Sequence, residues 1–388
     1  MHLPHCAICG QPLGEPIYSS APHQSLTSLC RIHPDETRVF ACTGCGHLQT
    51  SAITNVDAYY DAEYDILVDS EEEDQIYEIR DGKTTYRTEH QVKVLLKKLG
   101  FQRHVDLLDY GCAKSSTIRA LCSTTLSVTP HVFDVSARYV PFWEKFIAPD
   151  KWAVNSTKEE WNSRFDVVTS FFSMEHIPTV TESTREIAKL LKPGGIFYFV
   201  IPNVFGNSAD FIVVDHCNHF TPSSLGHLLW DAGLNLREID AHAHRGAFVV
   251  VAERPLDGKI SNSRAARAEI ERTCDELSAM ADFWRDAAAK VRAREARLTD
   301  DDRIAVYGAG FYGAFIFANL THPERIACYL DQNPFLQGKE SNGRPILPPS
   351  ELPSDVKTVF VGLNPVHAKA IISDVATLSK RELDYFYL

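Results

Sequence analysis

The hydrophobic and polar positions follow two patterns in alternation over much of the chain. Between residues 84 and 99 the apolar residues recur at helical spacing, and Gly100 ends that stretch. Short apolar runs of strand length follow at 105–111 (VDLLDYG) and 131–136 (HVFDVS). Helices that alternate with short buried strands predict an α/β domain.

The same alternation continues to about residue 254. We expect a strand at 165–172, a helix at 182–191 closed by a KPGG turn, a strand at 196–202, a helix at 225–232 and a closing strand at 247–253. Residues 256–299 are instead charged and rich in alanine, which predicts a long helix or a helix pair. A coiled coil that binds a partner is less favoured, because the heptads are few and broken.

A second α/β pattern begins near residue 304. The strand Ile304–Tyr307 leads into Gly308, Gly310 and Gly313, and the next strand ends at Asp331. This pattern is the dinucleotide fingerprint with its ribose-binding acid. The segment is only about half of a full dinucleotide fold. An NAD(P) site and a cofactor-free domain that shapes or covers the substrate cleft therefore both stay open.

Composition and charge narrow the class of protein. The 388 residues, 44% hydrophobic and 23% charged, are typical of a soluble protein with two or three domains. A formal charge of −12 argues against nonspecific binding to nucleic acid or to an anionic membrane. No apolar run reaches the ~20 residues that span a bilayer, and the first residues lack the pattern of a signal peptide. We therefore expect a cytoplasmic protein.

The cysteines gather at the start of the sequence. Cys6 and Cys9 are separated by two residues, as are Cys42 and Cys45, and each pair is followed by glycine. Four thiolates at this spacing predict a closed tetrahedral Zn²⁺ site with a structural role. The alternatives are free thiols, or Cys30, His33 or His47 in place of one ligand.

Residues at two expected strand ends are suited to binding a cofactor. Gly111 lets the backbone pass close to a ligand at a helix N-terminus, and Asp134 can accept both hydroxyl protons of a ribose diol. With Asp109 they resemble the S-adenosylmethionine (SAM) site of class I methyltransferases, although the turn lacks the later glycines of the usual motif. The resemblance implies further SAM contacts from Ala113, Val135, Ser156, Phe171 and Ser173.

The order of parts resembles the deoxysugar C-methyltransferases that act on nucleotide-linked keto sugars. The paired CxxC motifs, LLDYG, FDVVTSFF and the terminal YGAG block carry this resemblance. It implies a zinc-binding module at 1–70, a class I SAM-methyltransferase Rossmann-like domain at 71–255, a helical linker at 256–299 and a small Rossmann-like α/β domain at 300–388. It also implies that the nucleotide-linked sugar lies between the middle and C-terminal domains.

The segment DHCNHFTP (215–222) is the expected catalytic region. It is similar to a variant found in sugar-pathway methyltransferases that include O-methylating enzymes, so C-methylation is only slightly favoured. We expect His216 to be the base, with His219 second if a helical turn brings both rings to one face, and Asp215 to bind substrate. Alternatively, these residues cap the following helix. A metal site here and a role for Glu175 and His176 are both less favoured.

Other classes of function remain open on the sequence. One is an NAD(P)-dependent oxidoreductase that uses the C-terminal glycines. Another is a zinc-binding scaffold that recruits a partner, although a scaffold has no need of Asp109 and Asp134. The tyrosines Tyr59, Tyr60 and Tyr64 either line a substrate cleft or pack between domains. The sequence predicts no oligomeric state.

Overall fold

The computed structural model describes residues 4–54, 74–80, 83–125, 127–261 and 263–388. Tyr59, Tyr60 and Tyr64 lie outside the described residues. The chain divides into two compact units: residues 1–15, 40–210 and 217–275 form the first, and residues 16–39, 211–216 and 276–388 form the second. Each unit therefore combines segments that are distant in sequence. The four-part division at residues 70, 255 and 299 stays a prediction.

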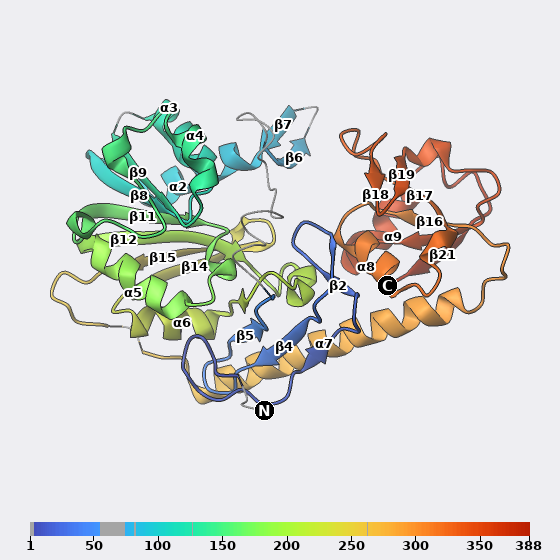
Figure 1. Ribbon diagram of the computed structural model, residues 1–388, viewed down its shortest axis with the longest axis horizontal. Helices are drawn as coiled ribbons and strands as arrows, with labels where there is room; N and C mark the ends of the chain where they lie inside the picture. The colour runs from blue at the N-terminus through green and yellow to red at the C-terminus, as the bar shows by residue number, and fades with distance from the viewer. Residues whose placement is uncertain (1–3, 55–73, 81–82, 126, 262) are drawn as a thin grey trace. The chain divides into compact units, whose positions relative to one another are not determined.

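The first unit contains a seven-stranded sheet in the order β10-β9-β8-β11-β12-β15-β14 (Figure 1). Its strands are β8 Val105–Tyr110, β9 Val128–Asp134, β10 Trp152–Val154, β11 Phe165–Phe171, β12 Leu191–Pro202, β14 Asn235–His244 and β15 Ala247–Glu253. The first five strands in this order are parallel, and β15 runs antiparallel to β12 and β14. The chain leaves β8 toward one edge and returns at β11, so the strand order reverses between β8 and β11. Ligands of open α/β sheets bind at the carboxyl ends of strands at such a point.

Helices cover both faces of this sheet. The helices of the first unit are α2 Arg87–Leu99, α3 Ser116–Thr124, α4 Val140–Trp143, α5 Val180–Leu190 and α6 Pro222–Asp231. Helices α2 and α3 cover one face, and α5 and α6 cover the other (Figure 1). Side chains of α2 and α3 pack with Leu107 and Tyr198, whereas those of α5 and α6 pack with Leu108 and Phe199. Burial on both faces explains why the strands read as nearly continuous apolar runs.

Two parts of this unit differ from the sequence prediction. The helix expected from residue 84 begins at Arg87, because residues 83–86 form strand β7 (Lys83–Tyr86) and pair with β6 (Ile76–Arg80). Strand β14 was not predicted: its sequence, NLREIDAHAH, is mostly polar because β14 is the last strand in the sheet order. The β6–β7 and β14–β15 hairpins depend on pairing between neighbouring strands, and the local hydrophobic periodicity does not predict such pairing.

The cysteine segment of the first unit contacts three other elements of that unit. Strand β5 (Leu48–Thr50) pairs antiparallel with β13 (Asn218–His219). The Thr221 hydroxyl, at the N-terminus of α6, donates a 2.9 Å hydrogen bond to the carbonyl oxygen of Gly46. The Thr181 hydroxyl on α5 donates to the carbonyl oxygen of Ala7 at 2.6 Å. The cysteine segment is thus bonded to both helices of one sheet face.

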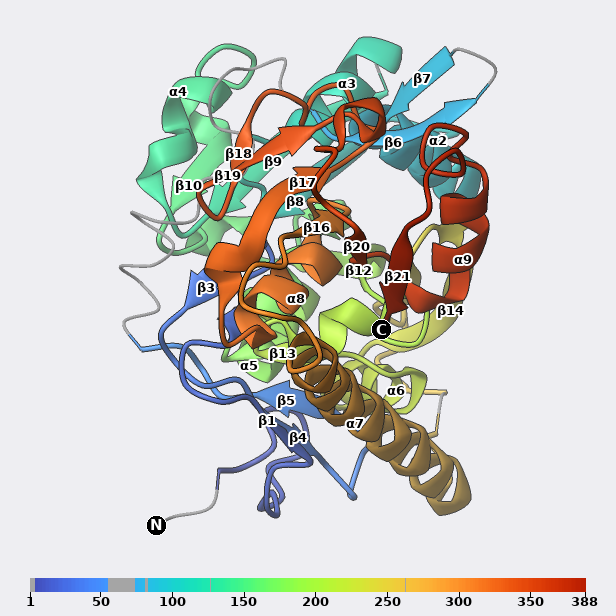
Figure 2. The same cartoon turned by 90° about the vertical axis from the view of Figure 1, so that its right-hand side faces the viewer.

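The second unit contains a six-stranded sheet in the order β18-β19-β17-β16-β20-β21 (Figure 2). Its strands are β16 Ile304–Tyr307, β17 Ile326–Leu330, β18 Glu340–Ser341, β19 Arg344–Leu347, β20 Thr358–Val361 and β21 Asp384–Tyr387. Helix α8 (Phe311–Asn319) packs on one face and α9 (Pro365–Ser373) on the other. Short strands from the N-terminal segment, β1 Tyr18–Ser19, β2 Ser25–Leu26, β3 Ile32–His33 and β4 Arg38–Ala41, also occur.

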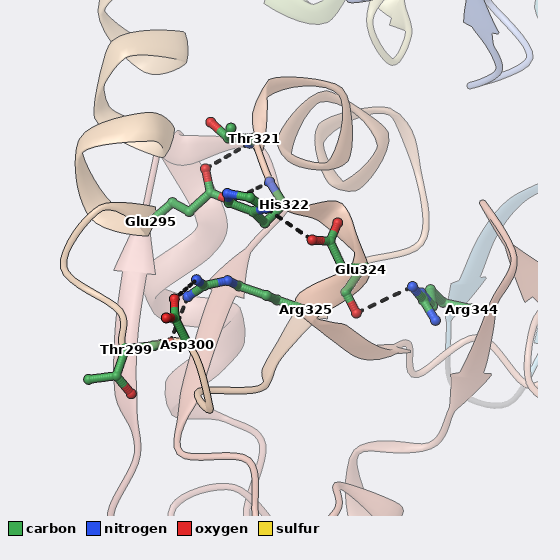
Figure 3. Close-up of polar contacts among 8 residues, drawn as sticks. All are labelled: Glu295, Thr299, Asp300, Thr321, His322, Glu324, Arg325 and Arg344. Atoms are coloured by element: carbon green, nitrogen blue, oxygen red, sulfur yellow. Dashed lines mark hydrogen bonds and ion pairs between the residues drawn. The ribbon is translucent and has the colours of Figure 1, made fainter.

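The predicted linker contains one long helix, α7 (Arg267–Glu295), which ends in the second unit. Glu295 is buried, and its carboxylate accepts hydrogen bonds from the backbone N–H groups of Thr321 and His322, each at 2.7 Å (Figure 3). Arg325 donates to the carbonyl oxygen of Thr299 just beyond the helix (Figure 3). A carboxylate at a helix C-terminus opposes the helix dipole, so these two N–H donors offset an unfavourable position. No helix within the described residues is long and apolar enough to cross a membrane.

Candidate active site

A tight turn after β8 forms the centre of the candidate site. Gly111 has a φ of +69°, and Ala113 and Ser115 also have positive φ values of +45° and +54°. A side chain at position 111 would lie 2.0 Å from the Oγ atom of Ser173, so glycine is required where the end of β11 packs on the turn. Left-handed residues other than glycine are strained and gather at functional sites. The turn leads directly into α3.

Asp109 holds this turn in place. Its buried carboxylate accepts hydrogen bonds from the Ser115 hydroxyl at 2.8 Å and from the Thr169 hydroxyl at 2.9 Å. Burial raises the pKa of Asp109 to about 6, against the opposing effect of these two donors. Asp109 therefore fixes β8, β11 and the start of α3 relative to one another, and whether it also contacts SAM stays a prediction.

Asp134 lies at the end of β9 and faces the same turn. Its carboxylate accepts the N–H of Ala113 at 2.8 Å and the N–H of Ser136 at 3.0 Å. Burial raises the pKa of Asp134. The next residue, Val135, is 64% exposed, which is unusual for valine and provides an apolar surface beside the acid. A ribose diol on Asp134 and an adenine on Val135 would suit this pair.

The remaining predicted SAM residues lie at the same edge of the sheet. Ser156 is exposed just after β10, and Phe171 and Ser173 are half-buried at the end of β11. The structure therefore brings all the predicted cofactor residues to the carboxyl ends of four neighbouring strands. Their contacts with SAM stay predictions.

The four predicted zinc ligands also come together. One sulfur atom from each of Cys6, Cys9, Cys42 and Cys45 lies within 4.8 Å of the others, with 3.7 Å between Cys6 and Cys45 and 3.4 Å between Cys9 and Cys42. Tetrahedral Zn–S bonds of about 2.3 Å place the sulfur atoms about 3.8 Å apart. The N–H groups of Gly10 and Gly46 donate to the carbonyl oxygens of Cys6 and Cys42, which closes both turns. The donor set and its spacing fit Zn²⁺ without an open coordination position.

A cavity of about 680 Å³ lies beside the cysteine cluster. Its walls come from residues 5–11 and from polar side chains of α5 and α6, including Arg185, which forms a 2.5 Å ion pair with Asp231. None of the predicted SAM or catalytic residues lines it. The cavity is therefore separate from the turn after β8.

The predicted catalytic segment does not form the helical turn that would bring the rings of His216 and His219 to one face. Residues Asn218–His219 form strand β13, so His216 and His219 do not share a helix face. The Nδ1 atom of His219 lies 2.9 Å from an Asp210 carboxylate oxygen and Nε2 lies 2.8 Å from the Thr50 hydroxyl. Because the carboxylate can only accept, Nδ1–H donates to Asp210 and Thr50 donates to Nε2. His219 is fully buried and both of its ring nitrogens are bonded within the protein.

Asp215 and His216 belong to the second unit. The Asp215 carboxylate accepts hydrogen bonds from the backbone N–H and the hydroxyl of Ser28, both at 2.7 Å. His216 is buried with 8% exposure. The alternative that these residues cap α6 is wrong, because Thr221 and Ser224 form the capping box of that helix. The catalytic assignments themselves stay predictions.

The C-terminal glycines have packing partners within the second unit. A side chain at position 308 would lie 2.4 Å from the carbonyl oxygen of Gly362, and one at position 313 would lie 2.0 Å from that of Gly308. The Asp331 carboxylate accepts the N–H of Ala309 at 3.0 Å. Packing therefore accounts for Gly308 and Gly313 without a ligand, whereas a side chain at Gly310 would meet open space. An NAD(P) site here stays a prediction.

Sequence reasoning missed a group of aromatic and basic residues in the first unit. We call it the Phe172 cluster, and it consists of Tyr77, Arg87, His90, Phe172, His244 and Arg245. Phe172 follows β11 with a φ of +52°, a rare conformation for a bulky residue. No spacing in the sequence marks these residues, because they come from β6, α2, β11 and the β14–β15 hairpin.

A methyltransferase family model and several known methyltransferases are similar to part of this chain. A family model described as a methyltransferase domain matches residues 77–239. A ubiquinone biosynthesis O-methyltransferase of Nitrosospira multiformis is 25% identical over 184 residues, which cover 41% of this chain and 76% of that protein. A putative methyltransferase from Bacillus halodurans is 15% identical, and the match covers 42% of this chain and 98% of that protein, with a TM-score of 0.35. A Haloferax volcanii putative methyltransferase in complex with the Trm112 activator is 18% identical and covers 44% of this chain and 91% of the matched one, with a TM-score of 0.38.

The family match spans the turn after β8, both acidic strand ends and five of the seven strands in full, together with part of β14. With the class I strand order, it makes this chain a SAM-dependent methyltransferase.

Proposed function

We propose that this methyltransferase acts on a nucleotide-linked keto sugar and methylates the carbon next to the ketone. The observation that carries the proposal is the combination of parts in one chain: a cluster of four cysteines, a class I sheet, and a second, mostly parallel sheet with a glycine turn. This combination is that of the deoxysugar C-methyltransferases that the sequence resembles. The resemblance in the order of parts supports the substrate class by analogy.

The reaction needs little from the protein besides position and a base. SAM carries its methyl group on a sulfonium, so the enzyme must hold the acceptor in line and remove the proton next to the ketone. We assign the base to His216. His219 is assigned a structural role instead, because Asp210 and Thr50 already bond to both of its ring nitrogens.

We also propose that Cys6, Cys9, Cys42 and Cys45 hold a structural Zn²⁺ ion. Four thiolates complete its coordination, so the ion has no position for a substrate. Its effect is to fix the segment that bonds to α5 and α6 through Ala7 and Gly46.

Sugar O-methylation is the second candidate. The relative from Nitrosospira multiformis is named as an O-methyltransferase. In that reaction the base removes a hydroxyl proton, and the same cofactor site serves.

The test uses SAM carrying a ¹³C-labelled methyl group and a thymidine diphosphate-linked 4-keto-6-deoxy sugar. We expect a product whose labelled methyl carbon is bonded to carbon, which ¹³C NMR separates from an O-methyl group. Asp134→Asn should weaken SAM binding by roughly 10-fold or more in calorimetry, because it removes a charge-assisted acceptor for the ribose. The exposed Asp150→Asn is the matched control and should bind SAM normally.

His216→Ala in the same assay should lose turnover while it still binds SAM. An O-methyl product would favour the second candidate. SAM binding without turnover of any nucleotide-linked sugar would contradict the proposed acceptor class, and full activity of His216→Ala would remove this residue from the mechanism.

A further inference from the structure

The carboxyl edge of the seven-stranded sheet continues beyond the candidate SAM residues. Those residues occupy the ends of β8 to β11. The edge then passes Pro202 at the end of β12 and reaches His244 at the end of β14, because Pro202 and His244 both pair with Ala247 of β15. Phe172 joins the two parts, since its neighbour Ser173 packs against Gly111 and its own ring lies 5.3 Å from the ring of His244. A methyl acceptor must lie next to the methionine end of SAM, and this part of the edge would be adjacent to that end if SAM binds at the turn after β8 as proposed.

One ring nitrogen of His244 has no hydrogen-bond partner among the residues that the structure describes. Its Nδ1–H donates to the carbonyl oxygen of Arg245 at 3.2 Å, so Nε2 carries a lone pair. Nε2 is buried and has no hydrogen-bond partner among the described residues. Buried polar atoms are nearly always bonded, and the exceptions require an explanation.

The surroundings of His244 are suited to a ligand that has a hydrogen-bond donor group and an apolar surface. The rings of Tyr77, His90 and Phe172 stand edge-on to the imidazole, with centroids 5.0, 5.3 and 5.3 Å away. His90 cannot supply the missing proton through Nε2, because that nitrogen donates to the carbonyl oxygen of Ala243 at 2.8 Å. The Tyr77 hydroxyl accepts the N–H of Arg245 at 2.9 Å. A sugar, with hydroxyl groups on an apolar ring face, matches such a setting.

We propose that Nε2 of His244 accepts a hydrogen bond from a hydroxyl group of the methyl acceptor, and that Tyr77 and Phe172 contact the acceptor ring. The proposal rests on the proposed function, since it names the residues that bind the sugar. The acceptor reaches Nε2 when the Tyr77 ring, held on the β6–β7 hairpin, moves aside.

His244 is assigned a binding role and not the role of base. Burial lowers the pKa of His244 to about 4, and the charges of the nearby His90, Arg87 and Arg245 act in the same direction. The imidazole is therefore neutral at pH 7 and is a weak proton acceptor, although it is a good hydrogen-bond acceptor. This division leaves proton removal to another group.

The first test follows the His244 ring directly. The full chain is labelled with ¹⁵N-histidine and saturated with S-adenosylhomocysteine, and the thymidine diphosphate-linked 4-keto-6-deoxy sugar, methyl glucoside or inorganic pyrophosphate is then added. We expect the Nε2 resonance of His244, assigned by its loss in His244→Phe, to move upfield with the nucleotide-linked sugar and to stay in place with pyrophosphate. If the resonance stays in place with both the nucleotide-linked sugar and methyl glucoside, the proposal is overturned. A shift with methyl glucoside alone supports the binding role of His244, with a free sugar as the ligand.

The second test uses substitutions of similar size. His244→Phe keeps a ring but has no acceptor, and we expect it to raise the KM for the sugar roughly 3- to 10-fold at unchanged SAM affinity. His244→Gln, which can place an oxygen near the position of Nε2, should recover part of that loss. His242→Phe on the same strand is exposed and serves as the control.

The outcomes separate the two proposals. An unchanged KM in a folded His244→Phe variant overturns the binding role, even if the wild type turns over the sugar. If the wild type binds SAM but turns over no nucleotide-linked sugar, the proposed function fails, and the ¹⁵N shift with methyl glucoside still decides the role of His244.

Discussion

Two histidines three positions apart are assigned different roles. The ring of His219 joins Asp210 and Thr50 inside the first unit, whereas His216 belongs to the second. Removal of a buried ring with two bonded nitrogens leaves partners without hydrogen bonds, which typically destabilises a protein.

We therefore expect His219→Ala to lower the free energy of unfolding by about 2–4 kcal/mol and to leave SAM affinity unchanged at a temperature where it remains folded. Urea unfolding and calorimetry measure the two quantities. His216→Ala is the matched variant, and it should affect turnover far more than stability. A His219→Ala protein of normal stability that lacks turnover would instead make His219 the base.

At this scale the sequence predicted positions better than roles. Asp109 and Asp134 were expected at strand ends, and both lie there, because a short apolar run indicates where a buried strand begins and ends. Spacing does not specify where a carboxylate points, and Asp109 turns inward to Ser115 and Thr169. His244 was missed for a similar reason: its burial depends on Tyr77 and Phe172, which are far away in sequence.

Among the elements, the cysteine segment contacts the start of α6 through the backbone carbonyl oxygen of Gly46. Gly46, one residue after Cys45, has a φ of +73° and accepts the Thr221 hydroxyl that also caps α6. A metal ion that fixes the turn at Cys42 and Cys45 therefore also supports the first turn of that helix.

We expect one zinc ion per chain by elemental analysis, and its loss in Cys9→Ser. Because metal binding adds directly to folding free energy, the variant should lose on the order of 3 kcal/mol and unfold roughly 6–12 °C lower. Amide exchange at the start of α6 should become faster. Cys122→Ser on α3, outside the cluster, is the control. Metal-free wild type with an unchanged Tm would refute the structural role.

Elements that bury a repeating face were predictable, and those defined by a partner strand were not. The strands at 105–110 and 304–307 follow from their apolar runs, and α2 follows from its spacing apart from its start. By contrast, the polar strands β14 and β7 are defined by pairing with β15 and β6. The sequence offered no local signal for either.

For the whole molecule, buried histidines set the response to acid. Burial lowers the pKa of His47 to about 3 and those of His131 and His244 to about 4. Below the ordinary histidine pKa of about 6.5, the unfolded chain binds protons that these folded-state residues do not bind. Stability is therefore fully present above that pH and falls as pH decreases toward 4. Asp109, whose pKa burial raises to about 6, and Asp134, whose pKa burial also raises, act in the opposite sense but are outnumbered by the three histidines.

We expect the free energy of unfolding to be on the order of 3 kcal/mol lower at pH 5.5 than at pH 7.5. The measurement is urea unfolding at both pH values. His131→Phe replaces a ring that packs edge-on against Trp161 and Phe165, and it should reduce the difference by about 1.4 kcal/mol. Equal stability at both pH values would mean that these rings are protonated in the folded state.

The interleaved make-up of the two units has a consequence for the order in which the protein is made. Residues 16–39 leave the ribosome before the sheet of the first unit, yet they belong with residues 276–388, which come last. The first unit can be completed once residue 275 has emerged, while the early segment still lacks partners such as Arg285, which donates to the carbonyl oxygen of Ile17. A chain that stops early in α7 would therefore carry this segment without its native contacts to residues 276–388, which would favour the binding of proteases or chaperones there.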